Sequence, residues 1–186
     1  MVRPPTDLET VLNSEIKEWH FHIYFLQRNA SLHHAALELR DAVLRLRRDG
    51  AFVAVPLFRV NIEPIGPHPI GSYEIWVPSE TFSSVFSYLC INRGDLSILV
   101  HPLTRDQRAY GIDHETRNAW IGPSFPLDLS TLPLRSEDIP LQYPSLKLGY
   151  STTVPQFSLE ERRKLGDNIE RLLHGEKEAA RAPART

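Results

Sequence analysis

The residues of this sequence best suited to chemistry are two histidines, His20 and His22. They lie in the run Trp19 to Phe25, where apolar and polar side chains alternate with a period of two residues. In a β-strand this spacing puts both imidazoles on one face, roughly 7 Å apart. Two imidazoles so placed suit either two ligands of one metal ion or one ligand beside one acid–base group.

The elements that must position these residues follow from the hydrophobic spacing of residues 18–102. Strands are predicted at 19–25, 51–63, 72–77 and 95–100, and amphipathic helices at 29–49 and from 78 to 92. The order strand, helix, strand, strand, helix, strand is typical of the ferredoxin-like βαββαβ arrangement, which is an α+β fold. In this topology the spatial order of the strands is 4-1-3-2. The first strand is therefore central, and both helices cover one face of the sheet.

This topology brings three further ionisable residues to the face that carries His20 and His22. Glu74 alternates with apolar residues on the third strand, and His101 ends the fourth strand. His68 enters from the loop before the third strand. A proline follows both His68 and His101 and restricts their backbone, which suits preorganised ligands. Because burying imidazoles with a carboxylate is costly unless they are paired or bind a metal, the pattern predicts a shared site.

The remaining segments are predicted to flank this core within a single domain. Residues 1–17 are expected to form a flexible N-terminus, and the proline-rich residues 103–157 an ordered arm or lid. Capping-box spacing predicts a helix over 158–174, and the polar residues 175–186 are expected to be a disordered tail. The second face of the sheet must meet water, a later segment or a partner sheet, as in a barrel-like α+β dimer.

Composition argues against several classes of function. Lysine and arginine number 21 and aspartate and glutamate 23, so the sequence lacks the excess of basic residues that would indicate a nucleic-acid partner. Cys90 is the only cysteine, which excludes a thiolate zinc site and an intramolecular disulfide. Residues 1–18 are polar and acidic, so we expect them not to be a signal peptide, and no apolar run approaches the roughly 20 residues that span a bilayer. We therefore expect a cytoplasmic protein that does not bind membranes.

The donor set indicates a catalytic metal. Histidines with one carboxylate and no thiolate favour Fe(II), Mn(II) or Zn(II) in a catalytic site over a structural zinc. The adjacent residues Asp113 and His114 are a further candidate, because an imidazole that a carboxylate orients becomes an effective general base. The residues alone leave open which histidines bind the metal and which transfer protons.

Several separated segments, taken in order, resemble the DOPA 4,5-dioxygenase family. They are 19–25 (WHFHIYF), 66–74 (GPHPIGSYE), 99–104 (LVHPLT), 113–114 (DH), 119–122 (AWIG) and 141–149, followed by the last helix. The resemblance implies an iron-dependent extradiol dioxygenase that acts on L-DOPA in the formation of betalain pigments. Its product, seco-DOPA, closes without further enzyme to betalamic acid or muscaflavin, depending on whether the 4,5 or the 2,3 bond is cut.

With this resemblance, roles can be assigned to individual residues. The expected ligands of the Fe(II) ion, for which Zn(II) is a surrogate, are His22, His68 and His101. The expected catalytic side chains are His20, His114 and Glu74. Glu74 replaces one of the histidine ligands if the triad contains a carboxylate. The expected substrate-binding residues are Tyr24, Arg59 and Arg117, where an arginine meets the substrate carboxylate.

Two other functions of the same fold are alternatives. One is a zinc-dependent hydrolase or isomerase, which metal analysis and O2 consumption with L-DOPA would separate from the oxygenase. The other is a non-catalytic dimer that binds a small molecule, in which His22→Ala would change affinity without abolishing turnover. The expected partners are L-DOPA or a related catechol, O2, and a second copy in a homodimer, with a monomer as the alternative.

Overall fold

The computed structural model describes residues 3–105, 113–133, 135, 137–139, 141–153, 157–176, 179–180 and 182. The chain forms two compact units, residues 16–151 and the two ends, 1–15 with 152–186. The unit of the two ends contains the helices α1 (Leu8–Asn13) and α4 (Leu159–Leu173). Helix α4 begins after Ser158, whose side chain forms a capping box with Glu161. No helix among the described residues is long and apolar enough to cross a membrane.

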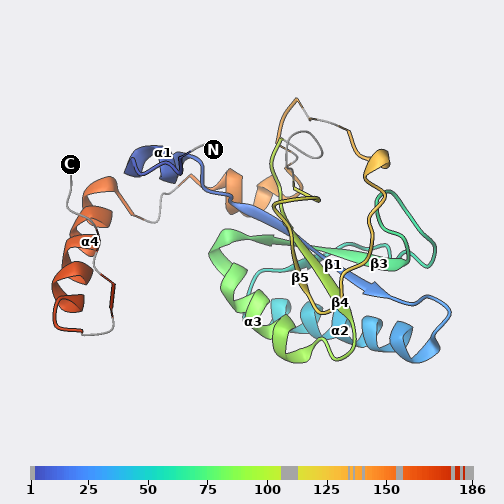
Figure 1. The fold of residues 1–186 in the computed structure, drawn as a ribbon. Helices are drawn as coiled ribbons and strands as arrows, with labels where there is room; N and C mark the ends of the chain where they lie inside the picture. The colour runs from blue at the N-terminus through green and yellow to red at the C-terminus, as the bar shows by residue number, and fades with distance from the viewer. Residues whose placement is uncertain are drawn as a thin grey trace. The chain divides into compact units, whose positions relative to one another are not determined.

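The unit of residues 16–151 is built on a five-stranded antiparallel sheet in the order β2-β3-β1-β4-β5 (Figure 1). The strands are β1 (Glu18–Phe25), β2 (Val55–Pro56), β3 (Gly71–Pro78), β4 (Ser97–Pro102) and β5 (Ala119–Ile121). Strand β1 lies between β3 and β4, so the predicted α+β fold and its strand order are confirmed. The short strand β5 extends the sheet beyond β4 and was not predicted.

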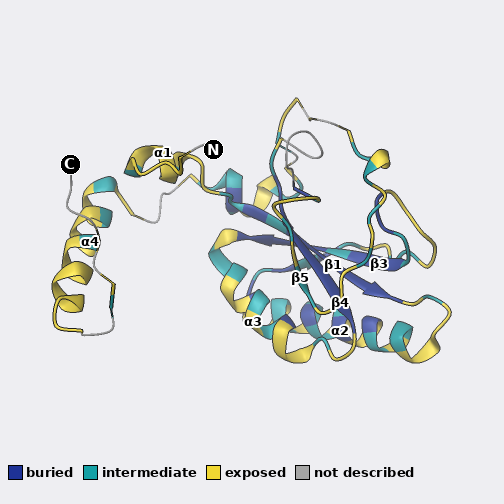
Figure 2. Ribbon diagram, viewed as in Figure 1, coloured by how far each residue is buried: buried dark blue, intermediate teal, exposed yellow. Residues whose placement is uncertain are grey.

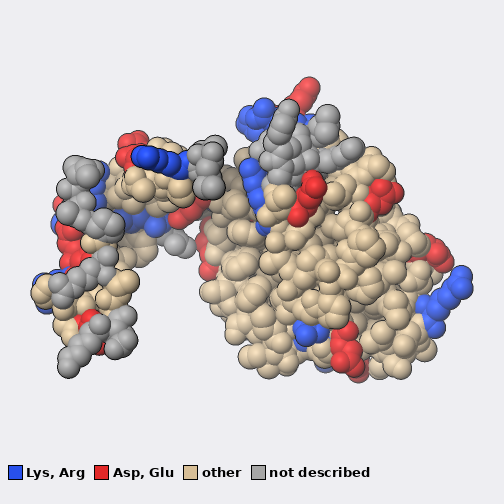
Figure 3. Space-filling view, in the orientation of Figure 1, with Lys and Arg blue, Asp and Glu red and all other residues tan. Residues whose placement is uncertain are grey.

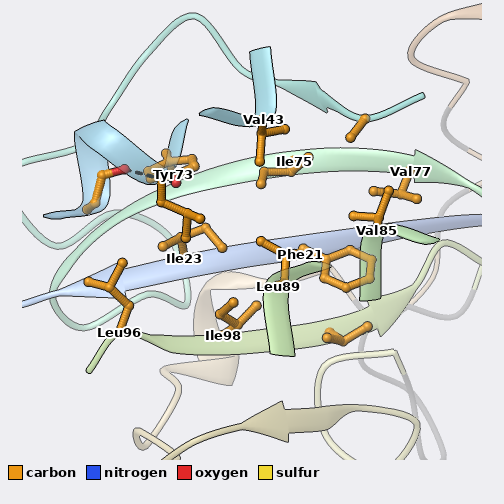
Figure 4. Close-up of a cluster of buried hydrophobic side chains, with 14 of the residues drawn as sticks. Phe21, Ile23, Val43, Tyr73, Ile75, Val77, Val85, Leu89, Leu96 and Ile98 are labelled. Carbon is orange, nitrogen blue, oxygen red and sulfur yellow. Dashed lines mark hydrogen bonds between the residues drawn. The ribbon is translucent and has the colours of Figure 1, made fainter. Parts of the chain in front are cut away.

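Two helices, α2 (Ala30–Arg48) and α3 (Phe82–Asn92), cover one face of the sheet (Figure 1). The core between them and the sheet contains Phe21, Ile23, Phe25, Tyr73, Ile75, Val77, Ile98 and Val100 from the strands, Leu96 just before β4, and Ala36, Leu39, Val43, Val85 and Leu89 from the helices (Figure 4). Strands β1, β3 and β4 are buried along almost their whole length, while the outer faces of the helices are exposed (Figure 2). The predicted alternation of core-facing residues is thus confirmed on three strands.

The strand predicted over residues 51–63 is wrong in length. Only Val55–Pro56 pairs with β3, and Asn61 adds one isolated bridge to Ser72. The Leu57 N–H still donates to the Glu74 carbonyl of β3 at 2.8 Å. The chain then leaves the sheet, because the Arg40 guanidinium of α2 donates hydrogen bonds to the carbonyl oxygens of Leu57 at 2.9 Å and Phe58 at 3.1 Å. A proline at the sheet edge also removes one N–H from the strand.

The second face of the sheet is covered by a later segment of the same chain. Besides β5, this segment contains three 3₁₀ turns of three residues each, η2 (Leu129–Thr131), η3 (Pro144–Leu146) and η4 (Gly149–Ser151). A further turn, η1 (Ser79–Thr81), precedes α3. We call residues 141–151 the strap. Charged side chains are scattered over the face seen in Figure 3. A separate set of ionisable side chains is buried, among them Glu18, His20, His22, His68, His101 and Asp113.

Candidate metal centre

The ionisable side chains of β1 lie on the face opposite the core. His20, His22 and Tyr24 are 8%, 4% and 1% exposed. In the sheet register His20 is opposite His101 of β4, and His22 is opposite Glu74 of β3. Because side chains at paired positions share a face, the predicted convergence of Glu74 and His101 on β1 is present in the structure.

The centre of this group is the pair His22 and His101. Their Nε2 atoms are 3.0 Å apart, and the two rings are stacked with an interplanar angle of 10°. The Nδ1 atom of His101 lies 2.9 Å from the carbonyl oxygen of Pro102. Since a carbonyl oxygen can only accept, Nδ1 carries the proton and Nε2 of His101 presents a lone pair toward His22. Fixing one ring nitrogen in this way is usual for histidines that bind metals.

His20 is held by two neighbouring polar side chains. Its Nε2 atom is 3.0 Å from Oε1 of Gln142 in the strap and 3.3 Å from Oε1 of Glu74. The Gln142 amide nitrogen donates to the same Glu74 oxygen at 2.8 Å. With the amide nitrogen facing the carboxylate, the amide oxygen faces His20, so Nε2 of His20 carries the proton and its lone pair is on Nδ1.

These three histidines could hold a metal ion. His20, His22 and His101 each offer a ligand atom, and these atoms all lie within 4.8 Å of one another. Two imidazole nitrogens bound at a right angle to one ion, each about 2.1 Å from it, would be about 3 Å apart. The His22–His101 separation of 3.0 Å matches this, so the donor set fits a metal centre.

His68 reaches the same group from the loop before β3. Its ring centroid is 4.2 Å from that of His22, and its Nδ1 atom is 2.6 Å from the hydroxyl of Tyr24. The Tyr24 ring also packs against Trp120 and Phe125, with centroids 5.2 and 5.8 Å away. The histidines therefore lie beside a wall of aromatic rings, which suits a flat organic ligand.

Burial keeps the imidazoles of this group uncharged. It lowers the pKa of His20, places the pKa of His22 and His101 well below its usual range, and lowers the pKa of His68 to about 4. The proximity of the other imidazoles contributes further in the same direction for His22 and His101. At neutral pH these side chains are therefore in the form that binds metal ions.

Asp113 and His114 lie in a turn beside the cluster. The ring centroid of His114 is 3.8 Å from that of His101. The buried Asp113 carboxylate accepts hydrogen bonds from the backbone N–H of Thr104 at 2.7 Å and from its hydroxyl at 2.9 Å. Burial nevertheless raises the pKa of Asp113. This carboxylate therefore anchors the turn to the end of β4, which holds His114 against the cluster.

The two arginines predicted to bind a substrate carboxylate lie in different surroundings. Arg117 is paired with Asp113, with its Nη1 atom 3.4 Å from the carboxylate, and its side chain is 42% exposed. Arg59 is exposed in the loop that follows β2. Arg117 thus joins the turn that carries His114, whereas Arg59 stays a sequence-based prediction.

Two carboxylates hold the strap to the sheet. The buried Glu18 side chain accepts hydrogen bonds from the indole N–H of Trp76 at 2.9 Å and from the backbone N–H of Tyr150 at 3.1 Å. The Glu80 carboxylate accepts from the backbone N–H of Gly149 at 3.1 Å. Gly149 has φ 60°, and a Cβ atom there would overlap the Glu18 side chain. The strap therefore needs glycine at this position.

The fold and the cluster together define an α+β protein whose buried histidines could hold a metal ion. The chain belongs to the Dopa 4,5-dioxygenase family, whose model matches residues 19–131. This span includes all five histidines that meet on the sheet face. The family predicted from the separated sequence segments is thereby confirmed.

Relatives support the same membership. The DOPA 4,5-dioxygenase of Amanita muscaria is 77% identical over 183 residues, which is 98% of this chain and 79% of that protein. An uncharacterized 21.2 kDa protein of Botryotinia fuckeliana is 41% identical over 115 residues, covering 59% of this chain and 60% of that protein. The crystal structure of a candidate dioxygenase from Nostoc punctiforme aligns with a TM-score of 0.53 at 31% identity, over 62% of this chain and 90% of that one.

Two residues of the site, Gln142 and Glu18, were not predicted from the sequence. Glu18 continues the period-two pattern of His20 and His22, so the alternation of β1 already contained the signal that places it on this face. Gln142 lies in an irregular, proline-rich stretch without hydrophobic periodicity. Its contact with His20 joins residues 122 positions apart, which no local pattern indicates.

The stability of the metal-free protein should decrease as the pH falls. Histidines whose pKa is lower in the folded state than the unfolded value near 6.5 bind fewer protons when folded, so the free energy of unfolding falls below about pH 7. For His68 the loss extends to about pH 4. Thermal unfolding at pH 7 and pH 5 measures this. The loss of stability between pH 7 and pH 5 should be smaller in His68→Gln than in the wild type, and as large as in the wild type in His34→Gln, an exposed position on α2. Equal losses in the wild type and both variants would contradict a contribution of His68 to the pH dependence.

Replacing Gly149 with alanine should loosen the strap. We expect a loss of about 1–3 kcal/mol in the free energy of unfolding, from the left-handed backbone and the overlap with Glu18. Gly94→Ala is the matched control, because Gly94 has φ 57° but no atom near its added Cβ. Chemical denaturation of both variants isolates the overlap. If Gly149→Ala loses no more stability than Gly94→Ala, the strap does not pack on Glu18 as described.

Proposed function

We propose that this protein is an Fe(II)-dependent extradiol dioxygenase that cleaves the ring of L-DOPA with O2. The product is seco-DOPA, which cyclises to betalamic acid or muscaflavin in betalain pigment formation. The observation that carries the proposal is the buried group His20, His22 and His101, because three neutral imidazoles without a thiolate suit catalytic iron. The similarity to the Amanita muscaria enzyme named for DOPA supports the choice of substrate.

We assign the metal ligands to His20, His22 and His101, whereas the sequence-based set has His68 in place of His20. Support comes from the N–H groups of two of these rings, those of His20 and His101. Acceptors hold Nε2–H of His20 and Nδ1–H of His101, an arrangement usual for metal-binding histidines. His68 lies outside the set His20, His22 and His101, whose ligand atoms are within 4.8 Å of one another, and its Nδ1 atom contacts the hydroxyl of Tyr24.

Bound iron would hold the catechol and O2 together and acidify the catechol hydroxyls. The protein's own proton-transfer groups are then His68 and His114, which flank the cluster. His68 is neutral at pH 7, since its pKa is about 4, and can take up a hydroxyl proton as a general base. Burial raises the pKa of Tyr24, so its phenol stays protonated and can exchange a proton with His68 over 2.6 Å.

The aromatic wall and the nearby arginine complete the proposed site. Tyr24, Trp120 and Phe125 offer ring faces on which a catechol can pack. Arg117 is the group on the described chain that we assign to the substrate carboxylate, because it lies in the turn of His114 with a partly exposed guanidinium. Glu74 supports His20 rather than acting on the substrate directly.

The partners follow from this assignment. L-DOPA and O2 are the proposed substrates, and the reaction is proposed to occur in the cytoplasm. All three proposed ligands come from one chain, and the strap of that chain contacts His20, so each copy of a homodimer holds its own complete set of ligands.

Anaerobic loading with Fe(II), followed by L-DOPA and O2, tests the reaction. We expect O2 uptake and a yellow product, both lost in His22→Ala because that variant removes a ligand from the centre of the cluster. His34→Ala, on the exposed side of α2, should keep full turnover. A fully iron-loaded protein that consumes no O2 with L-DOPA would sink the proposal. Activity only with Zn(II) and without O2 would point to the hydrolase or isomerase alternative.

The ligand set is tested by comparing His20→Ala with His68→Ala. We expect His20→Ala to lose metal affinity, because it removes a ligand, and His68→Ala to retain the metal. His68→Ala should instead lower turnover by about 10²–10⁴-fold, the usual contribution of a general base. Metal content after dialysis and O2 uptake measure the two effects. Loss of metal in His68→Ala with metal retained in His20→Ala would restore the sequence-based assignment.

A further inference from the structure

The strap delivers one side chain to the cluster, that of Gln142. We propose that Gln142 is a positioning residue that fixes the proton of His20 on Nε2 and thereby leaves Nδ1 as the nitrogen able to bind a metal ion. The proposal deepens the proposed function, on which it rests in taking His20 as a ligand. Gln142 lies beyond residues 19–131, the part of the chain that the family model matches.

The polarity of three groups assigns the proton. A carboxylate only accepts hydrogen bonds, so the amide nitrogen of Gln142, 2.8 Å from Oε1 of Glu74, is the donor there. The amide oxygen is then the atom 3.0 Å from Nε2 of His20, and it too only accepts. If the amide were reversed, the oxygen of Gln142 would face Oε1 of Glu74, and two acceptors would meet with no proton between them. Glu74 therefore sets the orientation of the Gln142 amide, and the amide sets the tautomer of His20.

Little water is available to replace these hydrogen bonds. The side chains of His20 and Glu74 are 10% and 16% exposed. The neighbouring residue in the strap, Tyr143, packs against Trp76 with ring centroids 5.2 Å apart. The Gln142 amide therefore has few alternatives to the contacts it makes. Because its oxygen faces Nε2 of His20, this amide decides which nitrogen of His20 is protonated.

His101 is the other proposed ligand whose N–H has an identified acceptor, and its tautomer is fixed by the neighbouring residue. His101 donates from Nδ1 to the carbonyl oxygen of the next residue, Pro102. His20 depends instead on a residue 122 positions away in the sequence. The metal affinity of the cluster therefore depends on the position of the strap against the sheet, through the amide group of Gln142.

Two substitutions at position 142 separate this role from a simple packing role. Gln142→Glu keeps an acceptor opposite Nε2 of His20. Gln142→Lys offers only donors. Its ammonium would also pair with Glu74, whose Oε1 atom lies 3.3 Å from Nε2 of His20, so both acceptors of that N–H would be engaged elsewhere. Ser145→Lys adds the same charge to the strap at an exposed position and is the matched control.

The first readout is the 15N spectrum of the histidine rings in the metal-free full-length protein, with His20 assigned by its loss in His20→Gln. We expect the proton on Nε2 in the wild type and in Gln142→Glu, and on Nδ1 in Gln142→Lys. The second readout is Zn(II) and Fe(II) affinity by competition with a chelator. Gln142→Lys should weaken both by about 10- to 100-fold, and Ser145→Lys should stay within about twofold of the wild type.

A wild-type protein with the proton on Nδ1 of His20 would overturn the proposal, whatever the variants do. So would Gln142→Lys that keeps the Nε2 proton, because any loss of metal would then be an effect of charge alone. Failure of the iron-loaded wild type to consume O2 with L-DOPA would sink the proposed reaction instead. The tautomer and the metal affinity decide the role of Gln142 independently of that result.

Discussion

The site depends on one constraint, the cost of burying uncharged imidazoles on a sheet face. Each neutral ring has one N–H that needs an acceptor and one lone pair that needs a donor or a metal. For His101 the acceptor is the carbonyl of Pro102, and for His20 it is the amide of Gln142. The lone pairs that remain on the other nitrogen of each ring are what make a buried group of imidazoles a binding site for a cation.

The central strand joins this site to the core of the protein. Along β1, alternate side chains enter the apolar core, among them Phe21 and Ile23, while His20 and His22 point to the other face. Slipping the strand by one residue would exchange the two sets and destroy both the core and the cluster. The register of β1 against β3 and β4 is therefore fixed by apolar packing, and the histidines are placed with the accuracy of that packing.

Periodicity explains which parts the sequence could predict. The period-two pattern of 19–25 and the helical spacing of 82–90 survive any tertiary context, so the fold, the strand order and the face shared by His20, Glu74 and His101 followed from them. The length of β2 did not, because a side chain of α2 diverts the backbone there. The strap was described only as part of an arm, since its position depends on contacts with distant residues such as Glu18 rather than on local propensity.

The shortness of the two outer strands has a consequence for how the protein behaves in a crowded solution. Open sheet edges offer rows of free N–H and C=O groups on which another chain can add a strand, the first step toward aggregation. Here β2 pairs over two residues and contains a proline, and β5 pairs over three. The diversion of the chain after Pro56 thus leaves too little regular edge for a neighbouring molecule to join, so the sheet is protected against growing from one protein into the next.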